Sequence, residues 1–357
     1  MGSLFPSIKE GLRAKVSQLA AEKFRLIRLN FPTELEFEPI QLCNAKCFTC
    51  PYTKLSQLPD YTKQRMSRQQ IEKLLTNFYE NLLRYKYSGS TIINPFRFSD
   101  PLICPDLDLI LDFALKHHLK VQITTNAKGL NSRTIPLLEK NLSAIKDDIV
   151  ISILGSTEEQ VRKNMSIGLD YTIKKMNELK SEKSPILDRI MISLRVIDGT
   201  KEEQQQLQDL AQKFSSIGVR YHIRDNWIHN RIQGSISEQT PEHYVVGCKL
   251  YKNKLLRRME VMVNGNVVLC DDDAEGRRVF GNIFEQSIDE IWNGPLKKEH
   301  LAIFASQFST EKSNLLCTNC SRAVYKKHSS SIVDTISEIG LAPMAFQLKN
   351  KNFDTIS

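Results

Sequence analysis

The chain has 357 residues with a formal net charge of +8, and 41% of the residues are apolar. This length is enough for one large α/β domain and a smaller one, and the apolar fraction is ordinary for a globular protein. The N-terminal segment MGSLFPSIKEGLRAK lacks the apolar core of a signal peptide, and no later run is long enough to span a bilayer. We therefore expect a cytoplasmic protein without a membrane partner.

The positive charge suits an anionic substrate, or an acidic electron donor of the flavodoxin or ferredoxin type. Basic pairs are scattered along the chain without interleaved aromatic residues, so they indicate solvated surface, and a nucleic-acid partner is not expected. They include Arg257-Arg258, Arg277-Arg278, Lys297-Lys298 and Lys326-Lys327. Eight cysteines in a chain without a signal peptide favour reduced thiols and metal binding over disulfides.

Residues 1–33 are expected to form a helical extension, because apolar residues recur at helical spacing before a turn at Pro32. From Glu34 onward, strand patterns alternate with helix patterns. The expected strands cover about 35–41, 91–97, 120–124, 149–153, 189–196 and 219–224. Mostly apolar strands that alternate with helices indicate an α/β fold with a parallel sheet covered by helices. Six such units predict a partial (β/α)6 barrel.

Three helices of this stretch have start signals of the capping-box type, in which a hydroxyl residue precedes Glu or Gln by three positions. The signals run from Ser67 to Gln70, from Ser156 to Glu159 and from Thr200 to Glu203. Gly218 is expected to end the last of these helices.

In folds of this kind the chemistry lies at the C-terminal ends of the strands. Segments with chemically functional residues stand at these positions, at or directly after the end of every predicted strand. In strand order they are Cys43 to Cys50, Phe98 to Leu102, Thr124 to Asn126, Ser152, Arg195, and finally His222, Arg224 and Asn226.

Cys43, Cys47 and Cys50 follow the first strand with the spacing C-x3-C-x2-C. Three thiolates can hold three irons of a cubic cluster, which leaves the fourth iron open to a small molecule. On spacing alone, the three cysteines could instead belong to a zinc knuckle or a ferredoxin-like site. A zinc knuckle, however, does not explain polar residues at the end of each strand.

This motif and its strand–helix context resemble the radical S-adenosylmethionine (radical SAM) superfamily. The resemblance implies a [4Fe–4S] cluster whose open iron chelates the amino and carboxylate groups of S-adenosylmethionine. It also implies one-electron cleavage of this cofactor to a 5′-deoxyadenosyl radical, which abstracts a hydrogen atom from the substrate.

Four residues match cofactor-binding positions of the superfamily. Asp100, followed by Pro101, stands where the family has the glutamate of its Gly-Gly-Glu-Pro motif, so its carboxylate would accept from the cofactor ammonium. The alternative for Asp100 is a turn residue before proline. Asn126 resembles the asparagine of the family's Thr-Asn-Gly, while Ser152 and Arg195 match positions that hold the ribose and the carboxylate. Arg195 could equally form an ion pair inside the barrel.

A second set of cysteines follows the barrel: Cys248, Cys270, Cys317 and Cys320. Asn264-Gly265 predicts a hairpin just before Cys270. Spacing alone allows either zinc or an iron–sulfur cluster. In order and context the set resembles the SPASM/twitch extension of radical SAM enzymes, in the shorter form with one auxiliary [4Fe–4S] cluster. The implied cofactors are therefore S-adenosylmethionine and two [4Fe–4S] clusters.

The expected domains are a helical extension (1–33), a radical SAM partial barrel (34–235), a smaller α+β twitch domain (236–325) and a tail (326–357). One cysteine, Cys104, remains outside the two sets. It is either a small apolar residue or a hydrogen-atom donor. His222, Arg224 and His229, near the sixth strand, could orient a polar substrate or accept a hydroxyl proton, or they could be surface residues.

The leading hypothesis is the oxidation of a small hydroxylated metabolite, such as a sugar or an aminocyclitol. The substrate would lose a hydrogen atom to the radical, a hydroxyl proton, and one electron to the auxiliary cluster. One alternative is an epimerase in which Cys104 returns the hydrogen. Others are a radical SAM enzyme that modifies a peptide, and a zinc-stabilised binding protein without enzymatic activity.

Overall fold

The computed structural model describes residues 18, 22, 24–25, 28–59, 61–224, 243–248, 255–305 and 323–327, with the backbone alone for 243–248, 304–305 and 323–327. Within these ranges the chain divides into two compact units. The larger unit takes its residues from 31–232 and 257–293, and the smaller one from 1–30, 233–256 and 294–357. The domain boundaries expected from the sequence stay a prediction.

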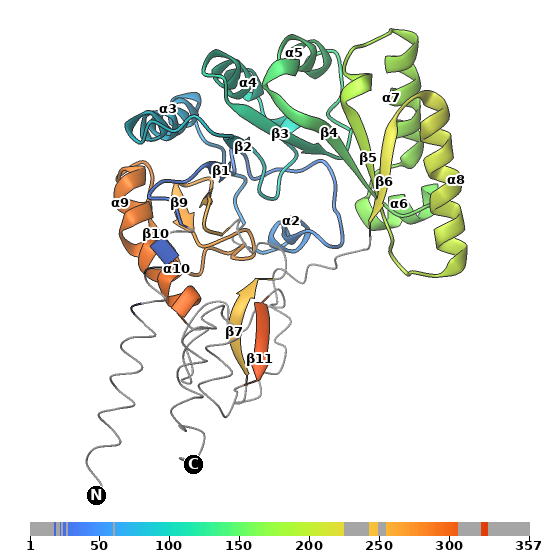
Figure 1. The fold of residues 1–357 in the computed structure, drawn as a ribbon. Coiled ribbons are helices and arrows are strands. Elements are labelled where there is room, and N and C mark those ends of the chain that lie inside the picture. The colour runs from blue at the N-terminus through green and yellow to red at the C-terminus, as the bar shows by residue number, and fades with distance from the viewer. Residues whose placement is uncertain are drawn as a thin grey trace, which may run out of the picture. The chain divides into compact units, whose positions relative to one another are not determined.

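The larger unit is built on one open nine-stranded sheet in the order β10-β9-β8-β1-β2-β3-β4-β5-β6 (Figure 1). The six strands predicted from the sequence are all present, and they pair in parallel and in chain order. They are β1 (Glu34–Phe37), β2 (Ile92–Asn94), β3 (Lys120–Thr125), β4 (Ile145–Leu154), β5 (Ile190–Arg195) and β6 (Arg220–Arg224). The prediction of an α/β fold with an open, partial barrel is therefore confirmed.

Helices follow the strands and cover the outer side of the curved sheet, as α3, α4, α5, α7 and α8 do in Figure 1. The α-helices are α2 (Pro51–Leu55), α3 (Arg68–Arg84), α4 (Leu107–Lys116), α5 (Thr134–Lys140), α6 (Glu158–Met165), α7 (Leu169–Ser181) and α8 (Lys201–Ile217). Short 3-10 turns are η1 (Pro101–Ile103), η2 (Leu142–Ala144) and η3 (Leu187–Arg189).

The capping signals are confirmed in part. Ser67 and Gln70 form the predicted reciprocal box at the start of α3, and Gly218 ends α8 with a φ of +98°. The start of α6 is one residue later than predicted, because Thr157, and not Ser156, accepts the Gln160 N–H at 3.2 Å. Ser156 instead donates its hydroxyl to the side chain of Gln160 at 2.8 Å.

The predicted hairpin exists and extends the same sheet. β8 (Arg258–Val261) pairs in parallel with β1, while β9 (Asn266–Val268) and β10 (Val279–Asn282) are antiparallel to their neighbours. Gly265 closes the turn between β8 and β9 with a φ of +86°, and its N–H donates to the Met262 carbonyl at 2.9 Å. The short helix α9 (Ile288–Asn293) follows β10 and buries Ile291 and Trp292.

The smaller unit contains α10 (Pro295–Ala305) and the antiparallel pair β7 (His243–Cys248) and β11 (Ala323–Lys327). Within it, Arg28 Nε donates to Nδ1 of the fully buried His300 at 3.1 Å. Burial, with the Arg28 charge beside it, lowers the pKa of His300 to about 3. Most of the predicted N-terminal helix and the C-terminal tail lie outside the described residues. Among the described helices, none has the length and apolar character needed to cross a membrane.

Candidate functional site

The two faces of the parallel sheet differ sharply in polarity. On β4, Ile149, Ile151 and Ile153 are at most 2% exposed, and they face the covering helices. The opposite face of β4 carries Ser152. We call this opposite face the inner face; it also carries Glu36 on β1 and Ser193 on β5. Because registered residues of parallel strands point to the same side, rows of polar side chains run across it.

The β8–β1–β2 end of the inner face is rich in buried carboxylates. Glu260, Glu36 and Asn94 are paired in register across these strands. The Arg258 guanidinium forms ion pairs with Glu34 at 3.1 Å, with Glu36, and with Glu260 at 3.6 Å. Burial, reinforced by the Glu36 charge, raises the pKa of Glu260. Among the described residues, neither amide atom of the fully buried Asn94 has a hydrogen-bond partner.

The β4–β5–β6 end of the inner face is basic. Ser152, Ser193 and His222 form one registered row, and Arg195 and Arg224 are paired in the row above it. Burial, and then the charges of Arg224 and Arg195, lower the pKa of His222, so its imidazole is neutral at pH 7. In the described part of the chain, Nε2 of His222 and Oγ of the 1% exposed Ser193 have no hydrogen-bond partner. Ser152 lies inside β4, two residues before its end, and not at the strand end predicted from the sequence.

Cys43, Cys47 and Cys50 lie together in the loop after β1. All three are partly exposed reduced thiols, and the Cys50 N–H donates to the Cys47 carbonyl at 3.0 Å. The loop is anchored on the last turn of α6: the N–H groups of Lys46 and Phe48 donate to the Met165 and Asn164 carbonyls at 2.8 and 2.9 Å. These carbonyls lack intrahelical partners, as expected at a helix C-terminus. The fold therefore presents all three thiols from one fixed loop.

The chemistry of this donor set fits an iron–sulfur cluster. Burial, together with the charges of nearby Asp100 and Cys50, raises the pKa of Cys43 to about 12. Burial also raises the pKa of Cys47, to which Cys50 and Cys43 contribute. Because each of these cysteines affects the pKa of another, their sulfurs must lie close together. Three thiols that resist ionisation need a metal cation to become thiolates. Asn126 Nδ2 lies 3.8 Å from Cys43 Sγ, as a donor to a metal-bound sulfur would.

Asp100 lies beside this loop at the start of η1 and is 2% exposed. Its carboxylate accepts from the Leu102 N–H at 2.9 Å, from the Thr125 hydroxyl at 2.8 and 3.0 Å, and from the Asn126 N–H at 2.9 Å. Burial raises the pKa of Asp100, whereas these donors favour its ionised form. The strand ends of β2 and β3 are thus joined through one buried carboxylate.

Sequence reasoning missed Arg97, which stands just before the segment recognised as a cofactor motif. It is 6% exposed, and its Nη2 donates to the Asp273 carbonyl at 2.8 Å and to the Cys270 carbonyl at 3.4 Å. Its Nε lies 3.8 Å from Glu260 Oε2, and its guanidinium lies over the Phe98 ring at 4.9 Å. The signal that the sequence offered for Arg97 was its position at the end of the predicted strand 91–97. Arg97 links the loop after β2 to the loop after β9.

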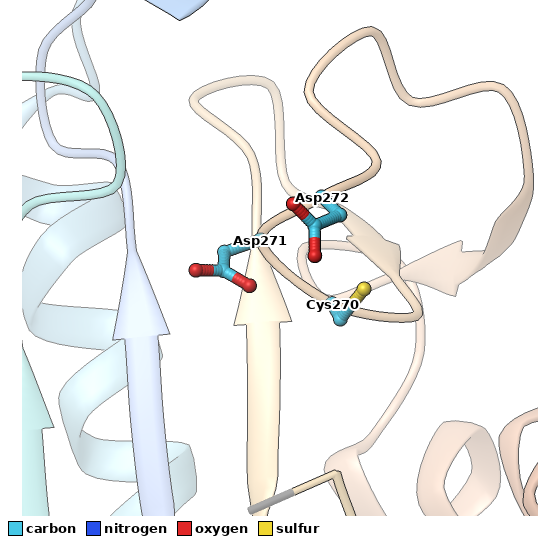
Figure 2. Close-up of side chains that lie close together, drawn as sticks. All are labelled: Cys270, Asp271 and Asp272. Carbon is cyan, nitrogen blue, oxygen red and sulfur yellow. The ribbon is translucent and has the colours of Figure 1, made fainter. Parts of the chain in front are cut away.

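Cys270 is the second residue of that loop after β9. Its sulfur and the carboxylates of Asp271 and Asp272 lie within 4.8 Å of one another, and Figure 2 shows all three on one short stretch. The loop also approaches the first cysteine set, because Ala274 packs in a small cluster with Tyr52, against which Cys43 and Cys50 are packed.

Three comparisons bear on this arrangement. A family model of an iron–sulfur cluster-binding domain, SPASM, matches residues 248–321. No curated protein sequence matches the chain. SuiB of Streptococcus suis bound to the precursor peptide SuiA is 17% identical with a TM-score of 0.53, over 85% of this chain and 73% of that chain. SuiB bound to S-adenosylmethionine gives 17% identity and a TM-score of 0.53, over 85% and 74%.

BtrN in complex with AdoMet and 2-DOIA is 18% identical over 81% of this chain and 92% of that chain, with a TM-score of 0.46. The fold therefore matches SuiB, and the cysteine-rich C-terminal part matches the SPASM model. The chain thus shares its fold with SuiB and carries a C-terminal segment that matches an iron–sulfur cluster-binding domain. These two matches agree with the resemblance recognised from the sequence, and the SPASM match indicates an iron–sulfur cluster-binding domain in residues 248–321.

Not every predicted residue of the radical SAM site lies on the inner face. Cys104 is fully buried at the end of η1, and the charged groups that affect its thiol are Asp106, Arg133 and Arg65. Burial raises the pKa of Cys104 to about 11. The structure therefore does not bring Cys104 together with the row that contains Ser193 and His222.

The remaining predicted residues are not placed. Cys317, Cys320, Asn226 and His229 lie outside the described residues, and Cys248 is described by its backbone alone as the last residue of β7. The auxiliary cluster set, Cys270 included, thus stays a prediction.

Proposed function

We propose that this protein is a radical SAM oxidoreductase that dehydrogenates a small hydroxylated metabolite, such as a sugar or an aminocyclitol. The observation that carries the proposal is the polar inner face of the sheet. Buried donors and acceptors on Asn94, Ser193 and His222 have no partner among the described residues. Hydroxyl groups both donate and accept, so a hydroxylated molecule would match this mixture better than an apolar one.

Cys43, Cys47 and Cys50 would hold the radical-initiating [4Fe–4S] cluster, and Ser152 and Arg195 would hold the ribose and carboxylate of S-adenosylmethionine. When both are bound, the cluster and S-adenosylmethionine would together supply a 5′-deoxyadenosyl radical that abstracts a hydrogen atom. Arg195 suits the carboxylate because its guanidinium presents paired donors, and its position on the inner face lets it reach into the barrel.

His222 is proposed to take the hydroxyl proton of the substrate. Oxidation of an alcohol to a carbonyl removes one hydrogen atom, one proton and one electron. The imidazole is neutral, because burial and the charges of Arg224 and Arg195 lower its pKa, and a neutral imidazole can accept a proton. The two arginines would at the same time attract an anionic group of the substrate.

The last electron is assigned to an auxiliary cluster held by the C-terminal cysteines, Cys248, Cys270, Cys317 and Cys320. An acidic protein of the flavodoxin or ferredoxin type is the proposed reductant of the first cluster, consistent with the net charge of +8. Full burial of Cys104 disfavours the alternative of an epimerase, because a hydrogen donor must reach the substrate radical.

Anaerobic reconstitution with iron and sulfide tests the proposal. With S-adenosylmethionine and dithionite, the reconstituted protein is expected to form 5′-deoxyadenosine, and Cys47→Ala to form none. A panel of polyols and aminocyclitols should contain a substrate that speeds this reaction and yields a product lighter by two hydrogens. Solvent deuterium in the product would indicate an epimerase instead. Zinc without iron and sulfide in the isolated protein would contradict the proposal.

A further inference from the structure

A chain of hydrogen bonds runs from Asp100 to the first cysteine of the C-x3-C-x2-C loop. Both oxygens of the Asp100 carboxylate are engaged, because Oδ1 accepts from Leu102 N and Thr125 Oγ1 while Oδ2 accepts from Thr125 Oγ1 and Asn126 N. The residue is 2% exposed. A carboxylate has about four lone-pair positions, and three donors, one of them the hydroxyl shared by both oxygens, already engage it, so little accepting capacity remains for an external ammonium group.

The next step in the chain is the side-chain amide of Asn126, whose orientation is fixed. Its Oδ1 accepts the Lys128 N–H at 3.0 Å, so the oxygen must point to residue 128. The amide nitrogen then faces the cysteine loop, where it donates to Asn44 Oδ1 at 2.7 Å and lies 3.8 Å from Cys43 Sγ. Asn126 is 7% exposed, so water competes weakly for these contacts.

We propose that Asp100 is a positioning residue that holds the Asn126 amide against Cys43, and that this amide raises the reduction potential of the cluster on the C-x3-C-x2-C loop. The inference rests on the proposed cluster at Cys43, Cys47 and Cys50. A cluster gains negative charge when it is reduced, so an N–H group directed at a cluster sulfur stabilises the reduced form more than the oxidised form. Asp100 acts indirectly, because its carboxylate holds the Thr125 hydroxyl and the Asn126 backbone N–H in place.

This role differs from the one expected from the sequence, in which Asp100 binds the cofactor ammonium. The two roles predict different results when S-adenosylmethionine is absent. A positioning residue changes the cluster before any S-adenosylmethionine is added. An ammonium ligand changes the affinity for S-adenosylmethionine and leaves the free cluster as it was.

The experiment is a redox titration of the full-length reconstituted protein, followed by electron paramagnetic resonance without S-adenosylmethionine. The relevant cluster is the one whose signal changes when S-adenosylmethionine is added afterwards. Asn126→Ala and Asp100→Asn are both expected to shift its midpoint potential to more negative values. The double variant should shift no further than the larger single shift, because both act through one contact. Asp112→Asn, on the exposed side of α4, should leave the potential unchanged.

Thr125→Val provides a milder variant if Asp100→Asn fails to fold, since it removes a hydroxyl that donates to Asp100 and keeps the shape of the side chain. It should shift the potential in the same direction. An unchanged midpoint in Asn126→Ala, or in whichever of Asp100→Asn and Thr125→Val folds, would overturn the inference, whatever the affinity for S-adenosylmethionine. A wild-type protein that binds no iron would instead defeat the proposed function.

Discussion

Glu203 on α8 is a buried carboxylate that holds the loop after β5. It is 2% exposed, and it accepts the N–H groups of Ile197, Asp198 and Gly199 at 2.7, 2.8 and 2.8 Å. This loop begins directly after Arg195, the last residue of β5. We predict that Glu203→Ala strongly destabilises the larger unit and frees the loop.

The size of the effect follows from the three bonds. A hydrogen bond to a charged group contributes about 1.5–3 kcal/mol, so the three together could contribute more than about 4.5 kcal/mol. Asp198 and Gly199 are exposed, however, and their N–H groups can regain water once the carboxylate is gone. We therefore expect Glu203→Ala to lower the free energy of unfolding by about 3 kcal/mol. Glu203→Gln keeps one accepting oxygen and should cost about 2 kcal/mol.

Urea unfolding followed by far-UV circular dichroism measures the loss. The matched control is Glu202→Gln, one residue earlier on α8, where the side chain is exposed. Its change should stay within about 0.5 kcal/mol. If Glu203→Ala changed the free energy of unfolding no more than Glu202→Gln, the three bonds would not stabilise the loop and the reasoning would be wrong.

Three further predictions concern the pKa values of His222 and His300 and the hairpin turn at Gly265. The pKa of His222 should lie below 6.5 in an NMR titration, and Arg224→Gln should raise it; an unchanged pKa would show that burial alone lowers it. The pKa of His300 is about 3 in the folded protein and 6.5 in the unfolded chain, so the unfolded chain binds a proton first as the pH falls. The free energy of unfolding should therefore fall by about 1.4 kcal/mol per pH unit below 6.5. His300→Asn should remove that slope in urea unfolding at pH 7.5 and 5.5, whereas the exposed His118→Asn should keep it. Gly265→Ala should destabilise the hairpin by about 2–4 kcal/mol, because its φ is +86° and a Cβ would lie 2.4 Å from an aromatic carbon; an unchanged unfolding midpoint would contradict this.

Local signals predicted most of the fold. Each of the six parallel strands carries apolar residues at least at alternate positions, and the Ser67 capping box requires residues within one helical turn, so neighbouring residues determine them. The errors are also local in origin. Two adjacent hydroxyl residues precede α6, and the backbone uses Thr157 as the cap while Ser156 binds Gln160. Thr200 caps α8 as predicted and accepts the Glu203 N–H at 3.1 Å, but the Glu203 carboxylate reaches back past Thr200 to three earlier N–H groups.

Features that depend on distant residues could not be predicted from the sequence. The hairpin itself was predicted from Asn264-Gly265, but its parallel pairing with β1 joins residues more than two hundred positions apart. Arg97 became a site residue only through carbonyl groups of the loop after β9. Asn94 lies in the middle of the predicted strand 91–97, and its importance comes from the registered neighbours Glu36 and Glu260.

The polar inner face explains why such residues are compatible with a stable fold. An unpaired buried polar group costs about 1–3 kcal/mol, so the groups on Asn94 and Ser193, which have no partner among the described residues, would be a net loss if the barrel had no ligand to bind. The outer face compensates with continuous apolar packing under the helices, as on Ile149 and Ile151. The outer face of the sheet thus provides stability, and the inner face provides the groups for binding. We therefore predict that Asn94→Leu raises the free energy of unfolding while it weakens substrate binding.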